Sequence, residues 1–334
     1  MDTFELQDFN KRIGLNTDLQ NISKKICESY NLGDFISNEL IPIGYEDYNY
    51  YLTTSSGKYC VKIFSKIRTE EDVKNYLDRI KAVANSEINA PKPLMVNNDI
   101  TLSLDYDGNH YDICVFEYIN GKNYFELGEK PSKDVIKEIA RQTAMINNLD
   151  LKPVFIYDTW AIVNFVKEYN QKREYLSDDY KDEFDRLLVE LNNIDFTNLP
   201  KAFVHGDIIS TNVMLDENEK VWIIDFAVSN YLPRIIDLAV IACNMCLDEK
   251  SKDNTYENIA LLINEYNKYN QLTEYELKVF GIFYRLANAM HILQPQYIIK
   301  TDGDSDENQY WLNEGIIGYS YSEDESFEKI ISRR

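Results

Sequence analysis

The chain has 334 residues, a length that allows one large domain or two lobes, each burying a core of its own. It carries 35 basic and 56 acidic residues, and the net charge of -21 opposes binding to nucleic acid or to an anionic membrane by charge attraction. A cationic substrate would be compatible with this charge, although an acidic surface more often serves only solubility.

The cysteines and the first residues indicate the compartment. Five cysteines lie inside apolar runs, and their odd number would leave one unpaired in an oxidising compartment, so free thiols in a reducing cytoplasm explain them best. Residues 1–5 contain neither a basic region nor an apolar stretch and predict no signal peptide. No run of about eighteen apolar residues occurs, which argues against a spanning helix. We therefore expect a cytoplasmic protein.

Residues 18–118 predict a small sheet accompanied by two helices. The first helix covers 18–30, where apolar residues recur at helical spacing, and the second covers 69–84. The segment Ser55 to Gly57 predicts a hairpin turn between two strands. The expected strands are 39–43, 48–54, 58–64, 101–106 and 111–118.

Beyond Gly121 the pattern becomes largely helical. The change of class at 119–121 predicts a domain boundary, with lobes at 1–118 and 119–334 and a hinge at 115–119. The acidic stretch 302–306 is similar to a calcium loop but lacks the required Gly and Glu, so we expect a solvated loop. The expected helices are 133–148, 159–176, 179–192, 233–247, 256–269 and 274–293.

Cys243 and Cys246 have the spacing of a redox or zinc motif. They fall inside a predicted helix, with no second cysteine pair and no nearby His in the sequence. We therefore expect them to pack in the core.

The segment 203–215 and the strand after it carry three groups suited to phosphoryl chemistry. A hydroxyl that attacks a γ-phosphate needs a carboxylate to accept its proton, and the metal that bridges the phosphates needs oxygen ligands. The spacing from Asp207 to Asn212 matches the catalytic loop of protein kinases, and Asp225 follows where their metal-binding Asp-Phe-Gly would lie. Here Ala227 replaces that Gly and Gly206 replaces the Arg of the loop. These differences point away from protein kinases.

The pattern His-Gly-Asp, four residues, Asn, then Ile-Asp-Phe resembles the aminoglycoside phosphotransferase and choline kinase superfamily, which includes homoserine kinases of the same fold. The resemblance covers roughly residues 36–293. It implies an α+β, protein-kinase-like fold of two lobes with the active site between them. The small N-lobe would hold a five-stranded antiparallel sheet and one helix, and the larger C-lobe would be mainly helical.

The resemblance also assigns the nucleotide half of the site. Lys62 lies in a strand close to the Val-Ala-Ile-Lys type and would steady the phosphates of ATP. Gly44 lies in the loop that would cover those phosphates, and the hinge residues Glu117 and Ile119 would contact the nucleotide. The acidic partner of Lys62 stays unassigned, because Tyr76 stands near the position where the family has a Glu.

Three further residues have supporting or uncertain roles. His205 is a candidate for catalysis because an ordinary His titrates near neutral pH, but its counterpart in the family mainly braces the catalytic loop. Asp237 begins a predicted helix, and the resemblance implies that it ties the catalytic loop down. Arg285 is a candidate to meet a substrate carboxylate, although an Arg in a long helix is more often a surface or packing residue.

We predict transfer of the γ-phosphoryl group of ATP, with Mg²⁺, to a hydroxyl of a small molecule. Asp207 would orient and deprotonate the hydroxyl, and Asn212 and Asp225 would hold the metal. An amino alcohol or hydroxy amino acid, as in homoserine kinases, is the favoured acceptor. Choline, ethanolamine or aminoglycoside acceptors stay open, because 25 Tyr and many carboxylates suit them equally. A catalytically silent nucleotide-binding module is the alternative of another class.

Overall fold

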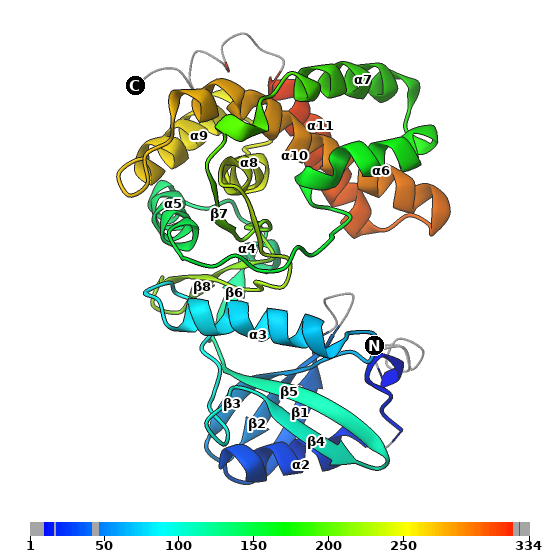
Figure 1. Ribbon diagram of the computed structural model, residues 1–334, viewed down its shortest axis with the longest axis vertical. Coiled ribbons are helices and arrows are strands. Elements are labelled where there is room, and N and C mark those ends of the chain that lie inside the picture. Colours follow the sequence, from blue (N-terminus) through cyan, green and yellow to red (C-terminus); the bar gives the residue numbers. More distant parts are fainter. Residues whose placement is uncertain (1–9, 17, 42–46, 323–326, 328–334) are drawn as a thin grey trace. The chain divides into compact units, whose positions relative to one another are not determined.

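The computed structural model describes residues 10–16, 18–41, 47–322 and 327, and the chain divides into two compact units (Figure 1). Unit 1 comprises Met1–Ser86 and Ala90–Asn120. Unit 2 comprises Glu87–Asn89 and Gly121–Arg334. No helix in the described residues is both long and apolar enough to cross a membrane.

Unit 1 is built on a five-stranded antiparallel sheet with the order β1-β2-β3-β5-β4. Buried and half-buried residues alternate along β2, so Tyr48, Tyr50 and Leu52 enter the core and share it with Ile22 and Ile26 of α2. The strands are β1 (Phe35–Leu40), β2 (Tyr48–Thr54), β3 (Gly57–Ile63), β4 (Leu102–Tyr106) and β5 (Asn109–Glu117).

Two of the helices of unit 1, α2 and α3, match the helices that the sequence predicted. The first, α2 (Leu19–Tyr30), begins at Asp18, whose carboxylate accepts the backbone N–H of Gln20. The second, α3 (Glu70–Ala84), begins at a capping box in which Thr69 and Asp72 satisfy each other's backbone N–H groups.

The first strand lies further toward the N-terminus than predicted. The prediction of 39–43 overlaps β1 only at its C-terminal end, and residues 42 and 43 lie outside the described residues. No residue of β1 is fully buried, and its sequence does not alternate regularly between apolar and polar residues, so the pattern did not show where the strand begins.

Unit 2 contains two small sheets and most of the helices. β7 (Lys201–Val204) pairs with β10 (Asn230–Pro233), and β8 (Val213–Asp216) pairs with both β6 (Gly121–Asn123) and β9 (Val221–Ile223). The predicted catalytic loop therefore connects one small sheet to the other. The helices are α4 (Tyr124–Leu127), α5 (Lys133–Asn147), α6 (Phe165–Lys172), α7 (Asp178–Asn192), α8 (Ile235–Asn244), α9 (Lys252–Tyr266), α10 (Glu274–Thr301) and α11 (Asp306–Ser322).

The helix predicted at 159–176 is shorter in the structure. Asp158 accepts the backbone N–H of Trp160 on its carboxylate, and its carbonyl oxygen accepts a hydrogen bond from the side chain of Asn164. These side-chain bonds fix the segment before α6, which includes a short 3₁₀ helix, Ile162–Asn164, and α6 starts only at Phe165. A further short 3₁₀ turn, Arg173–Tyr175, follows α6.

The C-terminal part of unit 2 contains a helix that the sequence did not predict. α10 continues past Pro295 to Thr301, beyond the predicted end at 293, and α11 follows after an exposed acidic loop. Two glycines in α11 explain why the sequence pattern did not predict this helix, because Gly disfavours helices. In the structure a Cβ at Gly315 would lie 2.8 Å from the backbone of His291, and one at Gly318 would overlap the side chain of Asn288. The glycines therefore let α11 pack closely on α10.

Candidate active site

The predicted catalytic loop, residues 205–212, follows β7 and is anchored by Asp237 in the first turn of α8. The Asp237 carboxylate accepts the backbone N–H groups of His205 at 3.1 Å and Gly206 at 2.7 Å. It also accepts the side-chain amide of Asn147 at 2.8 Å, and that amide donates to the carbonyl of Phe203. Asp237 is fully buried, and burial raises its pKa to about 6 against the opposing effect of these hydrogen bonds.

The imidazole of His205 joins the catalytic loop to the segment after β9. Its Nε2 lies 3.0 Å from the carbonyl oxygen of Ile224, and its Nδ1 accepts the backbone N–H of Asp207 at 3.2 Å. Nδ1 is thus an acceptor, so Nε2 carries the proton. Burial lowers the pKa of His205 to about 4, which makes the ring neutral at physiological pH. The ring centre lies 4.6 Å from that of Phe226. These contacts suit a bracing residue.

Asp207 and Asn212 contact each other directly. The Asn212 side-chain nitrogen donates to the Asp207 carboxylate at 2.7 Å and to the Asp207 carbonyl at 3.0 Å. Burial, followed by the charges of Asp158 and Asp225, raises the pKa of Asp207 to about 7, and the bond from Asn212 acts in the opposite direction. A carboxylate with such a pKa is well matched to accept a proton near neutral pH.

Asp225 is exposed and has an unusual backbone. Its φ is +63°, in the left-handed region that few non-glycine residues adopt. The preceding residue, Ile224, donates its N–H to the carbonyl of Asn212 at 2.9 Å, which ties this segment to the catalytic loop. Strained backbone of this kind is often found at functional sites.

The Asn212 and Asp225 side chains suit a small divalent cation. The Asn212 amide nitrogen is engaged by Asp207, so its carbonyl oxygen is the atom left for a metal, and Asp225 offers an exposed carboxylate. In the described residues, no group of three His, Cys, Asp or Glu side chains is placed to hold a metal. One carboxylate and one amide oxygen fit Mg²⁺, which protein sites commonly bind through few side chains plus substrate phosphates and water.

In unit 1, the acidic partner of Lys62 is Asp47. The Lys62 ammonium lies 3.2 Å from the buried Asp47 carboxylate, which also binds Arg68 through two hydrogen bonds of 2.7 and 3.0 Å. The backbone N–H of Ser65 donates to the same carboxylate at 3.1 Å. The ring of Tyr76, near the position of the family's Glu, lies 5.2 Å from Lys62. Although burial raises the pKa of Asp47, Lys62 and Arg68 outweigh it and hold the pKa below its ordinary value.

Glu117 and Ile119, two of the residues predicted to contact the nucleotide, lie at the end of β5 and just after it. Gly44 lies outside the described residues. The backbone N–H of Glu117, at the end of β5, donates to the carbonyl of Lys92 at 3.0 Å. The carbonyl oxygen of Glu117 is therefore the backbone group that would contact the base of the nucleotide. Ile119 is buried.

Arg285 of α10 forms an ion pair within unit 2. Its guanidinium binds the carboxylate of Glu190 on α7 through two hydrogen bonds, one of them 3.0 Å long. This contact agrees with the packing role that the sequence analysis gave as the alternative to binding a substrate carboxylate.

A buried polar network behind the catalytic loop was missed by the sequence analysis. The backbone N–H of Ser210 donates to the side-chain oxygen of Asn244 at 2.7 Å, and the Asn244 nitrogen donates to Glu314 at 2.5 Å. Glu314 also binds Lys130 and accepts the Tyr310 hydroxyl at 2.8 Å. Because α11 was not predicted, no sequence signal pointed to Glu314.

The fold also brings a His to the buried Cys243, contrary to the sequence expectation. The Cys243 sulfur lies 3.5 Å from Nδ1 of His291 on α10, and burial raises the pKa of the thiol. Cys243 and Cys246 are buried free thiols, which agrees with the prediction that they pack in the core. The sequence separation of 48 residues explains why the pattern alone did not show this contact.

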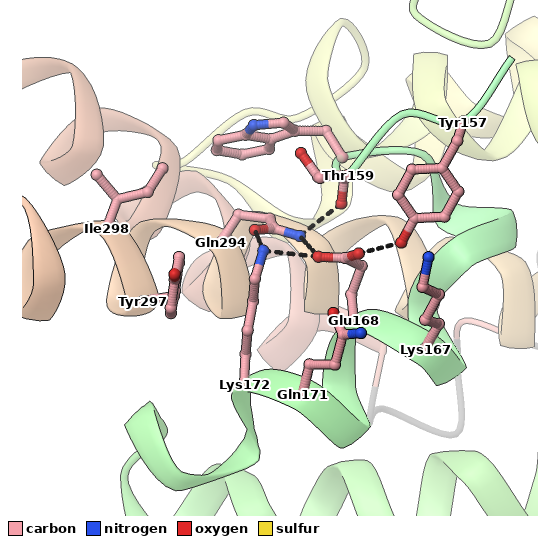
Figure 2. A pocket seen from close by; sticks show the side chains of 10 residues that line it. Tyr157, Thr159, Lys167, Glu168, Gln171, Lys172, Gln294, Tyr297 and Ile298 are labelled. Atoms are coloured by element: carbon pink, nitrogen blue, oxygen red, sulfur yellow. Dashed lines mark hydrogen bonds and ion pairs between the residues drawn. The ribbon is translucent and has the colours of Figure 1, made fainter.

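A pocket of ≈ 390 Å³ is lined by α6, α10 and residues of the loop before α6 (Figure 2). Tyr157, Thr159 and Trp160 contribute from that loop. Asp158, between them in the sequence, is one of the carboxylates that raise the pKa of Asp207. The loop that forms one wall of the pocket therefore comes within electrostatic reach of the predicted base.

The sequence of this chain is similar to a known family and to characterised kinases. A family model described as the phosphotransferase enzyme family matches residues 37–269. A homoserine kinase from Methylobacillus flagellatus is 22% identical over 228 residues, which are 66% of this chain and 67% of the relative. A homoserine kinase from Bartonella henselae is 21% identical over 294 residues, which are 85% of this chain and 88% of the relative.

Solved structures share the fold at lower identity. The amicoumacin kinase hAmiN, solved with AMP-PNP, Ca²⁺ and Ami, superimposes with a TM-score of 0.66 and 16% identity over 96% of each chain. The choline kinase LicA from Streptococcus pneumoniae has a TM-score of 0.61 and 15% identity over 91% of this chain and 99% of LicA. The predicted protein-kinase-like fold is thereby confirmed. Since the family model matches more than half of its residues, the chain belongs to the phosphotransferase enzyme family and is a small-molecule kinase.

Proposed function

We propose that this kinase transfers the γ-phosphoryl group of ATP to a hydroxyl of a small molecule, with Asp207 as the base. The observation that carries the proposal is the contact of Asp207 with Asn212, which orients a carboxylate whose pKa is raised to about 7. The acceptor oxygen forms a bond to the γ-phosphorus, and the bond from that phosphorus to the β-phosphate oxygen breaks. The hydroxyl proton passes to Asp207, and ADP leaves.

The remaining residues have supporting roles in this proposal. Asn212 and Asp225 would hold Mg²⁺, which when bound neutralises charge on the phosphates. Lys62, fixed by Asp47, would contact the phosphates, and Gly44, Glu117 and Ile119 would lie along the nucleotide. The solved structures of hAmiN with AMP-PNP and Ca²⁺, and of a spectinomycin phosphotransferase with ADP, support a nucleotide and a divalent cation for proteins of this fold.

His205 and Asp237 would act by positioning the catalytic loop. His205 is neutral and buried, with both ring nitrogens engaged, and so is poorly suited to exchange protons with a substrate. Asp237 binds two backbone N–H groups of the loop from within α8. Both contacts fix the backbone on which Asp207 stands.

For the acceptor we propose a hydroxy amino acid or an amino alcohol. The two homoserine kinases that match most of this chain support it. Choline or aminoglycoside acceptors are the second candidates, because the choline kinase LicA and the spectinomycin phosphotransferase have similar folds. A catalytically silent nucleotide-binding module is disfavoured, since Asp207, Asn212 and Asp225 are all present.

The proposal is tested by measuring ADP release from ATP and MgCl₂ with each of several acceptors. The panel contains L-homoserine, ethanolamine, choline, hydroxylysine and an aminoglycoside. We expect acceptor-dependent ADP release that disappears when Mg²⁺ is chelated. Clear ATP binding without release on any acceptor would favour the silent module instead.

A further inference from the structure

The pocket between α6, α10 and the loop at residues 157–160 has the size of a small-molecule site. Its volume of ≈ 390 Å³ lies in the range typical of ligand pockets, about 300–1,000 Å³. Trp160 and Tyr297 contribute aromatic surface, and Gln171 contributes an amide. Such a mixture of aromatic walls and polar groups suits a small polar molecule.

The one carboxylate that lines this pocket is already neutralised. Glu168 is only 2% exposed, and its carboxylate binds the Lys172 ammonium at 2.6 Å and the amide nitrogen of Gln294 at 3.1 Å (Figure 2). The Tyr157 hydroxyl donates to the same carboxylate. Glu168 therefore has little attraction left for a cationic ligand.

Two tyrosine faces in the pocket are occupied by the protein's own lysines. The Lys167 ammonium lies 3.8 Å from the centre of the Tyr157 ring, and the Lys172 ammonium lies 4.5 Å from the centre of the Tyr297 ring. A quaternary ammonium or a protonated amine would need such faces to be open. A cationic acceptor would therefore have to displace one of these lysines, and the charge of Lys167 would repel it.

The balance of charge in the pocket is positive. Lys167 and Lys172 contribute two positive charges and Glu168 one negative charge, in a chain whose net charge is -21. Lys172 and Glu168 neutralise each other, whereas Lys167 is exposed. From this arrangement we infer that the pocket binds the carboxylate of a hydroxylated acceptor, a hydroxy acid or hydroxy amino acid, and that Lys167 is the residue that selects for it.

The bound molecule would be the acceptor whose hydroxyl Asp207 deprotonates, so this inference rests on the proposed function. It narrows the acceptor class, because choline, ethanolamine and aminoglycosides all present cations without a carboxylate. A pocket built in this way gains specificity by repelling the wrong charge as well as by attracting the right one.

Calorimetric titration of the full chain with two matched pairs of ligands tests the inference without requiring turnover. The pairs are L-homoserine with its carboxamide, and glycerate with glycerol. We expect the carboxylate member of at least one pair to bind about tenfold tighter than its partner. The Lys167→Gln variant should lose that preference, while the binding of glycerol, the uncharged partner, stays the same.

Lys152 provides the matched control for Lys167. It is also an exposed lysine over a tyrosine ring, 5.0 Å from the centre of Tyr231, but it does not line the pocket. Lys152→Gln should keep the wild-type preference for the carboxylate ligand. Equal effects of the two substitutions would overturn the role of Lys167.

The outcomes separate this inference from the proposed function. Absence of binding by either carboxylate ligand, or tighter binding of the uncharged or cationic partners, would overturn the carboxylate pocket. Efficient phosphorylation of choline or an aminoglycoside would overturn it too, yet would uphold phosphoryl transfer. Selective carboxylate binding with no phosphorylation of any acceptor would support the pocket and contradict the proposed function.

Discussion

The side-chain amide of Asn212 donates a hydrogen bond of 2.7 Å to the carboxylate of Asp207, and a second bond of 3.0 Å to the Asp207 carbonyl. The pair thus couples the proposed base to one of the two proposed metal ligands. In the proposed function the same amide group would fix the base and present its oxygen to a cation, so both roles would depend on one side-chain orientation.

Replacing Asn212 by Ala should therefore reduce kcat strongly. We expect a loss of about 10²-fold or more, the usual range for disturbing a positioned proton acceptor, with only about 1 kcal/mol lost in the free energy of unfolding. Steady-state kinetics and urea denaturation measure the two quantities. Asn218→Ala, in the exposed turn between β8 and β9, is the control and should change neither. Equal kcat values for the two variants would contradict the role of Asn212.

Asp237→Ala should weaken both the fold and catalysis. The substitution leaves the buried backbone N–H of His205 and the half-buried N–H of Gly206 without their acceptor, and a buried unsatisfied group costs about 1–3 kcal/mol. We expect a lower urea midpoint and a larger effect on kcat than on KM for the acceptor. Asp253→Ala, at an exposed position in the first turn of α9, should leave both unchanged. Wild-type kcat in Asp237→Ala would show that the loop does not need this anchor.

The ion pairs of Asp47 should make the stability of unit 1 fall at acidic pH. Its pKa in the folded protein lies below the ordinary value because Lys62 and Arg68 outweigh the effect of burial. A depressed pKa contributes stability that is complete above the unfolded value, about 3.9, and is lost as the pH falls through the folded value. Urea denaturation from pH 6 down to pH 3 should show this loss in the wild type. The corresponding curve for Asp47→Asn should be lower and flatter, and parallel curves would be evidence against the ion pair.

Glu314 links α11 to the catalytic loop through Asn244 and Ser210. Glu314→Ala would leave the side-chain amide of Asn244 and the hydroxyl of Tyr310 without their acceptor, so we expect a loss of about 1–3 kcal/mol in the free energy of unfolding for each group. Glu314→Gln keeps an acceptor for Asn244 and should retain more of kcat than the alanine variant. The ratio of kcat in the two variants, measured at a temperature where both are folded, separates positioning of the loop from simple unfolding. Identical kcat values would indicate that the network acts on stability alone.

The sequence was sufficient to predict the fold, and its motif also predicts where the catalytic loop lies. The spacing of Asp207, Asn212 and Asp225 is local, and each residue follows or precedes a short apolar strand that the pattern reveals. The roles of these residues, like the assignment of 1–118 and 119–334 to separate lobes, stay predictions until they are tested.

The contacts that the sequence could not reveal join distant segments. Asp47 meets Lys62 because β2 and β3 pair with Asn49 opposite Lys62, a register that side-chain patterns did not define. Glu314 and Asn244 are 70 residues apart, and the helix that carries Glu314 was not predicted because of its two glycines. Glu168 and Gln294 are 126 residues apart, so the pocket that they share appears only when α6 packs on α10.

The most direct test of the account compares the wild type with Asp207→Asn by ³¹P NMR of the reaction with ATP, MgCl₂ and the acceptor that gives the fastest ADP release. The account predicts a phosphomonoester of the acceptor in the wild type. In the variant it predicts a rate lower by about 10²–10⁴-fold, with ATP binding preserved in a parallel titration. Formation of the same phosphomonoester at the wild-type rate by Asp207→Asn would contradict the assignment of Asp207 as the base.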